Sequence, residues 1–170
     1  MAGHQPMERE ISAGGVVVRR LRGRWHLAAI EPQGRVAKTA KAGRPKPVLA
    51  LPKGLVDAGE RPAETAVREV REETGLTAEI VAKLGDIKYV YQRTWGDRAR
   101  VFKIVSFYLL RYRAGRLGEI SPEMRVEVES ARWLPLDQAP KLLAYGGERE
   151  MAKKALDYVT RNPDVTGNAE

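Results

Sequence analysis

The chain has 170 residues, of which 43% are hydrophobic and 31% charged, a composition typical of one globular domain. It contains no cysteine, which excludes disulfides, zinc–thiolate sites and cysteine nucleophiles and fits a reducing cytoplasm. The N-terminal residues lack an apolar signal region and no long apolar run follows, so we expect a cytoplasmic protein without a membrane span. A net charge of +8 favours anionic partners, although the sequence contains no recognisable nucleic-acid reader module.

The N-terminal third predicts a β-hairpin followed by a basic loop. Residues 1–9 are polar and expected to be flexible, and the apolar stretches 11–20 and 25–30 predict two strands. The pair Gly14 and Gly15 in the first strand allows either a bulge or the close approach of a ligand.

The segment 33–47 has two prolines, two glycines, five cations and no acid, which predicts an exposed loop. It is interpreted either as a solvated insertion or as a cationic flap that reaches polyphosphate through Arg44 and Lys46. Residues 48–51 after it predict a short buried strand.

A helix is predicted over residues 63–74. Pro62 suits the first helical turn, an apolar stripe recurs at helical spacing, and Gly75 stands where a left-handed C-cap belongs. The acidic residues lie at i, i+3 and i+4, so they share one helix face: Glu69, Glu72 and Glu73.

Three carboxylates at this spacing allow two interpretations. They repel one another unless a divalent cation binds, and a cluster of oxygen ligands suits Mg²⁺ or Mn²⁺. The alternative is a solvated helix face with i,i+4 ion pairs such as Arg68 with Glu72. The helix alone leaves both interpretations open.

Residues preceding the helix add a second pattern. Gly54 is followed after five residues by Glu60, and after seven more by Arg68-Glu69-Val70-x-Glu72-Glu73-x-Gly75-Leu76. This spacing resembles the Nudix box, the signature of hydrolases that cleave nucleoside diphosphates linked to another group, and every defined position is matched. The box covers residues 54–76. The C-terminal pattern LPLDQAPKLLAY resembles bacterial enzymes that act on diadenosine polyphosphates and nucleoside triphosphates.

The resemblance implies a fold and a metal site. The expected fold is an α/β (α+β) class, Nudix-type α/β/α sandwich with a mixed central sheet, in a single domain over residues 1–170. Its cofactor would be Mg²⁺ or Mn²⁺, held by Glu69, Glu72, Glu73 and the backbone carbonyl of Lys53. Glu60 and Arg68 would form an ion pair that orients loop and helix, so Gly54, Glu60 and Gly75 are structural and Arg68 belongs to the catalytic set. Glu69 is the first choice for general base.

Beyond the box, strands are predicted at 77–87 and 101–113, with an aromatic, basic hairpin at 89–97 between them. Tyr89, Tyr91 and Trp95 are candidates for stacking on a base, and Arg93 for binding the substrate. Diadenosine polyphosphate hydrolases carry a tyrosine near the position of Tyr91, but packing is the preferred interpretation for each of these aromatic residues taken singly.

The alternating segment 125–135 predicts a strand in which Val126 and Val128 face opposite to Glu127 and Glu129. Glu127 stands six residues before Trp133, where the family often has a further acid, so it is a candidate metal ligand and the second choice for base. Glu129 is the reserve, and an exposed edge strand is the alternative for both. Helices are expected at 136–143 and 148–161, before a frayed end at 162–170.

The function implied is metal-dependent hydrolysis of a pyrophosphate linkage, with a dinucleoside polyphosphate such as diadenosine tetraphosphate as the first substrate. Alternatives are oxidised or ordinary nucleoside triphosphates, diphosphoinositol polyphosphates and, more distantly, RNA 5′ ends. A nucleotide-sensing module without hydrolysis is the non-enzymatic alternative. The box residues contact the pyrophosphate that these substrates share, so they leave the substrate and the oligomeric state open.

Overall fold

The computed structural model describes residues 6–34 and 46–165. Within these residues, six strands form one mixed sheet in the order β4-β5-β1-β2-β6, and β3 pairs with β1 off this path. The strands are β1 (Glu8–Leu21), β2 (Arg24–Pro32), β3 (Lys53–Leu55), β4 (Thr77–Gln92), β5 (Arg100–Ala114) and β6 (Val128–Pro135). The helices are α1 (Pro62–Thr74), α2 (Ala139–Leu142) and α3 (Gly146–Arg161), with a 3₁₀ turn at Met124–Val126.

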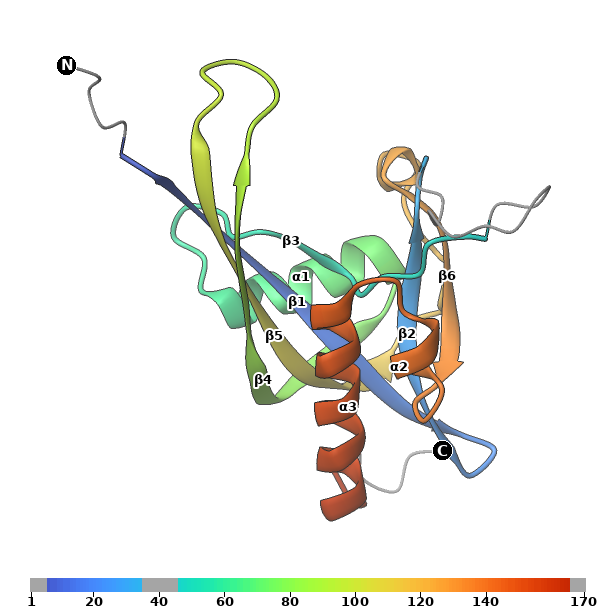
Figure 1. Cartoon of the computed structure of the whole chain (residues 1–170). Coiled ribbons are helices and arrows are strands. Elements are labelled where there is room, and N and C mark those ends of the chain that lie inside the picture. Colours follow the sequence, from blue (N-terminus) through green and yellow to red (C-terminus); the bar gives the residue numbers. More distant parts are fainter. Residues whose placement is uncertain (1–5, 35–45, 166–170) are drawn as a thin grey trace.

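The two faces of the sheet are covered by different helices. Figure 1 shows α1 behind the strands and α3 in front of them. On β1, Val17 packs in the cluster that holds Val70 of α1, whereas Val16 and Val18 pack in the cluster that holds Met151 of α3. This alternation follows from the two-residue period of a strand. The expected α/β/α sandwich with a mixed central sheet is therefore confirmed.

Helix α1 has the ends that its sequence predicts. Pro62 occupies the first turn, and Gly75 adopts a left-handed conformation with φ of 82° while its N–H donates to the carbonyl of Arg71 at 2.9 Å. Ala66 and Val70 are fully buried against the sheet. The box helix is thus anchored at both ends, and its acidic face is directed toward the β3 corner.

The predicted strand at 48–51 is wrong in its position. Val48 to Leu51 are buried as expected, but only Ala50 forms a bridge, with Ile30, and the paired strand is Lys53–Leu55. A run of apolar residues reports burial and carries no information about which backbone groups pair. The helix that ends the chain and the two long strands β4 and β5 lie where they were predicted, within a few residues.

Several predicted boundaries shift. Glu8 and Arg9, expected in a flexible segment, belong to β1 and pair with the start of β5. Strand β4 continues to Gln92, so Tyr89 and Tyr91 lie within it, and the loop of the β4–β5 hairpin projects past the start of β1 (Figure 1). At the C-terminal end, Val165 packs against the main core, so the predicted fraying does not hold for residues 162–165.

The predicted strand at 125–135 begins only at Val128. Met124–Val126 form a 3₁₀ turn and Glu127 follows it in a helical conformation with φ of −100° and ψ of −31°. Val126 is 77% exposed whereas Val128 is buried, so the expected shared face of these two valines is wrong. No helix within the described ranges is long and apolar enough to cross a membrane.

Candidate active site

The corner before the box lies against the glycine pair of β1. The N–H of Gly15 donates to the carbonyl of Pro52 at 3.1 Å, and Gly14 pairs with Lys53 across β1 and β3. A Cβ atom on Gly14 would lie 2.4 Å from the Pro52 carbonyl oxygen, closer than real Cβ contacts allow. The close approach that the sequence suggested is therefore made by this chain's own backbone, which fixes the position of Lys53.

Gly54 is required because a carboxylate occupies the space beside it. A Cβ atom at this position would lie 2.1 Å from Oε1 of Glu69. Residue 54 lies in β3 and residue 69 lies in the middle of α1, so the missing side chain lets the helix carboxylate reach the strand backbone. The box glycine thus determines where Glu69 lies.

Glu69 and Glu73 form a buried acidic pair, with exposed fractions of 8% and 6%. Burial and the charge of Glu69 raise the pKa of Glu73 to about 9, against a hydrogen bond from the backbone N–H of Lys53 that lowers it. Burial also raises the pKa of Glu69. The two carboxyl groups share a proton, which we place on Glu73, and Oε2 of Glu73 is buried without a hydrogen-bond partner.

Arg68 connects the box residues. Its guanidinium donates to Glu60 at 2.8 and 2.9 Å, to Glu69 at 2.9 Å and to Glu72 at 3.2 Å. Its hydrogen bonds, followed by one from Thr65, lower the pKa of Glu60 to about 2. The expected ion pair of Glu60 and Arg68 is present and connects the loop to the helix. The same guanidinium also contacts Glu72.

The donor set fits a hard divalent cation. Among residues 6–34 and 46–165, no three acidic or histidine side chains stand close enough to close a metal site on their own. Glu69 and Glu73 nevertheless place two carboxyl groups together, and Oε2 of Glu73 is buried without a hydrogen-bond partner, so a divalent cation would take the place of the shared proton. We conclude that the Glu69/Glu73 pair fits the cation, whereas Glu72, which like Glu69 accepts a hydrogen bond from Arg68, stays a predicted ligand.

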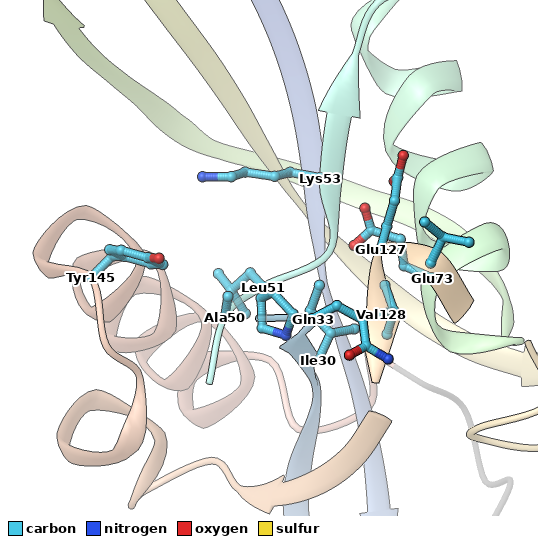
Figure 2. Close-up of a pocket in the computed structure, with 11 residues that line it drawn as sticks. Ile30, Gln33, Ala50, Leu51, Lys53, Glu73, Glu127, Val128 and Tyr145 are labelled. Atoms are coloured by element: carbon cyan, nitrogen blue, oxygen red, sulfur yellow. The ribbon is translucent and has the colours of Figure 1, made fainter. Parts of the chain in front are cut away.

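A cavity of about 320 Å³ opens beside the pair, and we call it the acidic cavity. Glu73 from α1 and Glu127 from the turn before β6 line one end, and Lys53 and Tyr145 line the other (Figure 2). The charge of Glu127 contributes to the raised pKa of Glu73, so the two carboxylates lie within electrostatic reach. Glu127 therefore reaches the predicted site from the turn rather than from the strand, whereas the reserve residue Glu129 is exposed outside it.

A second cavity, of about 500 Å³, lies on the other side of Lys53. We call it the lysine–tyrosine cavity, because its polar lining includes Lys53, Lys103, Tyr89 and Tyr145. The ammonium of Lys53 lies 5.7 Å from the centre of the Tyr145 ring, and both residues line both cavities. The two cavities are therefore neighbours that share one wall.

Of the predicted substrate contacts on the β4–β5 hairpin, only one lines either of the two cavities. Tyr89 lines the lysine–tyrosine cavity, but the hydroxyl of Tyr91 donates to Glu10 at 2.9 Å and Arg93 pairs with Glu8 at 2.5 Å. Trp95, at the hairpin tip, is 66% exposed.

Of the two substrate contacts predicted in the basic loop, only one lies within the described residues. Lys46 is exposed and lines neither cavity, and Arg44 lies outside the described residues.

Three residues at the cavities had no signal in the sequence: Lys103, Tyr145 and Glu148. Each belongs to a different element from the box, and only the fold brings them to Lys53. Glu148 is 2% exposed, and this buried acid at the start of a helix would have been predicted as an ordinary exposed residue of the first turn.

Comparison with known families decides the assignment. The NUDIX domain family model matches residues 13–155, which is most of the chain. The chain belongs to the Nudix family. Members of this family that are hydrolases act on pyrophosphate bonds of nucleoside diphosphate derivatives and generally use divalent metal ions.

The relatives by sequence are bacterial and MutT-like. A putative mutator protein MutT4 of Mycobacterium tuberculosis is 35% identical over 89% of this chain and 56% of its own length. An 8-oxo-(d)GTP phosphatase of Mycolicibacterium smegmatis is 33% identical over 68% of this chain and 31% of its own. An RNA pyrophosphohydrolase of Cereibacter sphaeroides is 34% identical over 62% of this chain and 68% of its own. The chain thus spans about half and about a third of the first two relatives.

Solved structures support the fold. The Ap4A hydrolase binary complex of C. elegans covers 89% of this Nudix chain and 98% of its own, with a TM-score of 0.63 at 21% identity. The MutT NUDIX hydrolase of Burkholderia pseudomallei covers 86% and 98%, with a TM-score of 0.58 at 20% identity. At these identities the likeness concerns the arrangement of strands and helices.

Proposed function

We propose that this Nudix protein is a metal-dependent hydrolase of a pyrophosphate linkage in a nucleoside polyphosphate. The observation that carries the proposal is the buried Glu69/Glu73 pair, whose unpartnered oxygen lies at a cavity that also contains Lys53. A buried acidic pair without a cation is unfavourable, because burial raises the pKa of both carboxyl groups and the charge of Glu69 raises that of Glu73 further. A cation-dependent site accounts for its retention.

The chain's own residues divide the work. Glu69 and Glu73, with the backbone carbonyl of Lys53, would hold the cation. When bound, it supplies positive charge that neutralises phosphate and lowers the pKa of water. Arg68 keeps the carboxylates in place through Glu60 and Glu69, and the Lys53 ammonium is placed to contact a phosphate oxygen. Water attacks one phosphorus, its proton passes to a carboxylate, and the second phosphate leaves with the bond electrons.

Two carboxylates compete for the role of general base. Glu69 is enclosed between Gly54 and Arg68, whereas Glu127 is exposed on the wall of the acidic cavity. A base must reach the proton that it takes, directly or through one water. This geometry favours Glu127 for the proton and leaves Glu69 for the cation, the reverse of the order that the sequence suggested.

The lining of the second cavity supports a substrate class. Tyr89 and Tyr145 supply aromatic surfaces for a base, and Lys53 and Lys103 supply charge for phosphates. A dinucleoside polyphosphate is our first candidate, with one nucleoside in the lysine–tyrosine cavity and the polyphosphate running past Lys53 into the acidic cavity. This placement would put the scissile linkage beside Glu73.

A nucleoside triphosphate, oxidised or ordinary, is the second candidate. It is favoured by the likeness to the putative mutator protein and the 8-oxo-(d)GTP phosphatase. Likeness to the RNA pyrophosphohydrolase keeps RNA 5′ ends in the comparison set, and the positive charge keeps diphosphoinositol polyphosphates there too. Sensing without cleavage is the non-enzymatic alternative. A solved NUDIX domain of Shewanella oneidensis NrtR has been crystallised with ADP ribose, at a TM-score of 0.59 and 15% identity.

A product-resolved screen tests the proposal. Diadenosine tetraphosphate, 8-oxo-dGTP, dGTP, 5′-triphosphate RNA, ADP-ribose and a diphosphoinositol phosphate are each incubated with protein and Mg²⁺ or Mn²⁺. We expect diadenosine tetraphosphate to be cleaved fastest and cleavage to stop with chelator. Faster cleavage of a nucleoside triphosphate would move the second candidate to first place. No cleavage of any substrate, together with tight nucleotide binding, would replace the enzyme by a sensor.

A further inference from the structure

Glu148 connects α3 to the corner before the box. It lies in the first turn of α3, is 2% exposed, and accepts a hydrogen bond from the backbone N–H of Leu51 at 2.6 Å. Its other oxygen accepts from the Lys53 ammonium at 3.3 Å. A buried carboxylate that is hydrogen-bonded in this way is a strong local constraint, because removal of either partner leaves a desolvated polar group.

The corner has little regular pairing of its own, so external contacts determine its position. Ala50 bridges Ile30 of β2, and the carbonyl of Pro52 accepts from Gly15 of β1. Leu51, between them, is held by Glu148 of α3. Two residues further along, the N–H of Lys53 donates to Glu73. A shift at Leu51 would therefore reach the buried acidic pair through two peptide units.

The Lys53 side chain is held away from the acidic pair. In Figure 2 it extends from the corner toward the side of Tyr145, whereas Glu73 and Glu127 lie on the opposite side. Its ammonium is placed by Oε2 of Glu148 and by the face of the Tyr145 ring, where the two cavities meet. Without the Glu148 carboxylate, the ammonium would lose its charged partner at the place where the two cavities meet.

We propose that Glu148 is a positioning residue for the pyrophosphate site: one carboxylate oxygen fixes the Leu51–Lys53 backbone against Glu73, and the other holds the Lys53 ammonium between the two cavities. This inference rests on the proposed function, because it assigns a role toward the cation and the phosphate chain. Glu148 contacts neither directly and acts through Leu51 and Lys53.

Two variants separate the two tasks of Glu148. Glu148→Gln keeps an oxygen for the Leu51 N–H but removes the negative charge beside Lys53. Glu148→Ala removes both contacts. Glu150→Gln, an exposed change on the same helix, is the matched control. The measurements are Mn²⁺ affinity by electron paramagnetic resonance without substrate, the chemical shift of the Leu51 amide, and kcat and KM for the best substrate of the screen.

We expect Glu148→Ala to weaken Mn²⁺ affinity about tenfold, as when a residue that orients a metal ligand is removed. The Leu51 amide resonance should move upfield, because this amide loses its hydrogen bond. Glu148→Gln should keep Mn²⁺ affinity and the Leu51 resonance near those of the wild type while raising KM with little change in kcat. Glu150→Gln should match the wild type in all three.

Folded Glu148→Ala with wild-type Mn²⁺ affinity would overturn the inference, as would Glu148→Gln with an unchanged KM. If Glu148→Ala does not fold, the amide shift and KM of Glu148→Gln still decide. Failure of the proposed function is distinguishable, because a wild type that cleaves nothing can still show Mn²⁺ affinity that depends on Glu148. Conversely, if the wild type hydrolyses a substrate and the Glu148 variants match it in Mn²⁺ affinity and KM, only the positioning role of Glu148 is excluded.

Discussion

The two cavities that meet at Lys53 differ in chemistry and in origin. The acidic pair Glu69 and Glu73, of which Glu73 lines the acidic cavity, comes from the single helix α1. The lysine–tyrosine cavity combines β4, β5, the β3 corner and the start of α3. Burial raises the pKa of Glu69 and Glu73 at the first cavity, whereas Tyr89 in the second is 44% exposed.

In the proposed function, the reaction depends on the acidic pair and the choice of substrate on the lysine–tyrosine cavity. Carboxylates on one helix face keep their mutual geometry as long as the helix forms, so a short segment specifies the cation site. A cavity built from four elements changes with any substitution in any of them, which suits it to choose between substrates. Substitutions at the acidic pair and in the lysine–tyrosine cavity should therefore affect different kinetic parameters.

The largest effect is expected at the acidic pair. Glu73→Gln should lower kcat about a hundredfold or more, about 3 kcal/mol, because an amide binds a divalent cation weakly. Steady-state turnover at saturating Mg²⁺ measures it, with the exposed Glu64→Gln on the same helix as control. Near-normal turnover of Glu73→Gln would remove Glu73 from the cation site.

Cation affinity should rise with pH. The pKa of Glu73 is raised from 4.5 to about 9 by burial, so a cation must displace a proton below that pH. Displacement of one proton gives an increase of up to about tenfold in Mn²⁺ affinity per pH unit between about pH 5 and 9. Calorimetry in buffers with different ionisation enthalpies measures the proton released. An affinity independent of pH would show that the pair is already ionised.

A smaller, selective effect is expected in the lysine–tyrosine cavity. Tyr89→Leu should raise KM about tenfold with little change in kcat, because loss of stacking on a base costs about 1–3 kcal/mol. Trp95→Leu, at the exposed hairpin tip outside both cavities, is the control. Equal effects of the two substitutions would place the base at the hairpin tip instead.

The smallest effect concerns stability without metal. A carboxyl group whose folded pKa is raised contributes most below its unfolded pKa of 4.5, and its contribution is lost as pH rises toward 9. In chelator at pH 8, Glu73→Gln should therefore raise Tm by about 2–4 °C, equivalent to about 1 kcal/mol. At pH 4.5 the gain should vanish. Thermal unfolding measures both, and a lower Tm for Glu73→Gln at pH 8 would contradict the buried, proton-sharing pair.

The sequence predicted features of the box better than contacts between strands. The ends of α1 followed from local sequence signals, whereas the contact of Arg68 with Glu60 was implied by the resemblance to the Nudix box. Tyr91 and Arg93 could not be separated from Tyr89 in the same way, because alternation along β4 does not reveal that Glu8 and Glu10 of β1 hold them. Their assignment as substrate contacts stays a prediction.

From the sequence alone, the α1 helix, its glycine C-cap and its acidic face could be predicted, and the resemblance to the Nudix box added the ion pair of Arg68 with Glu60. The helix and its acidic face depend on separations of three and four residues, which helix geometry converts directly into distances. Only the tertiary structure decided that Glu127 enters the acidic cavity from a turn and that Lys103, Tyr145 and Glu148 surround Lys53. Those contacts join residues 50 to 95 positions apart, where sheet order and helix packing, rather than local periodicity, determine what meets.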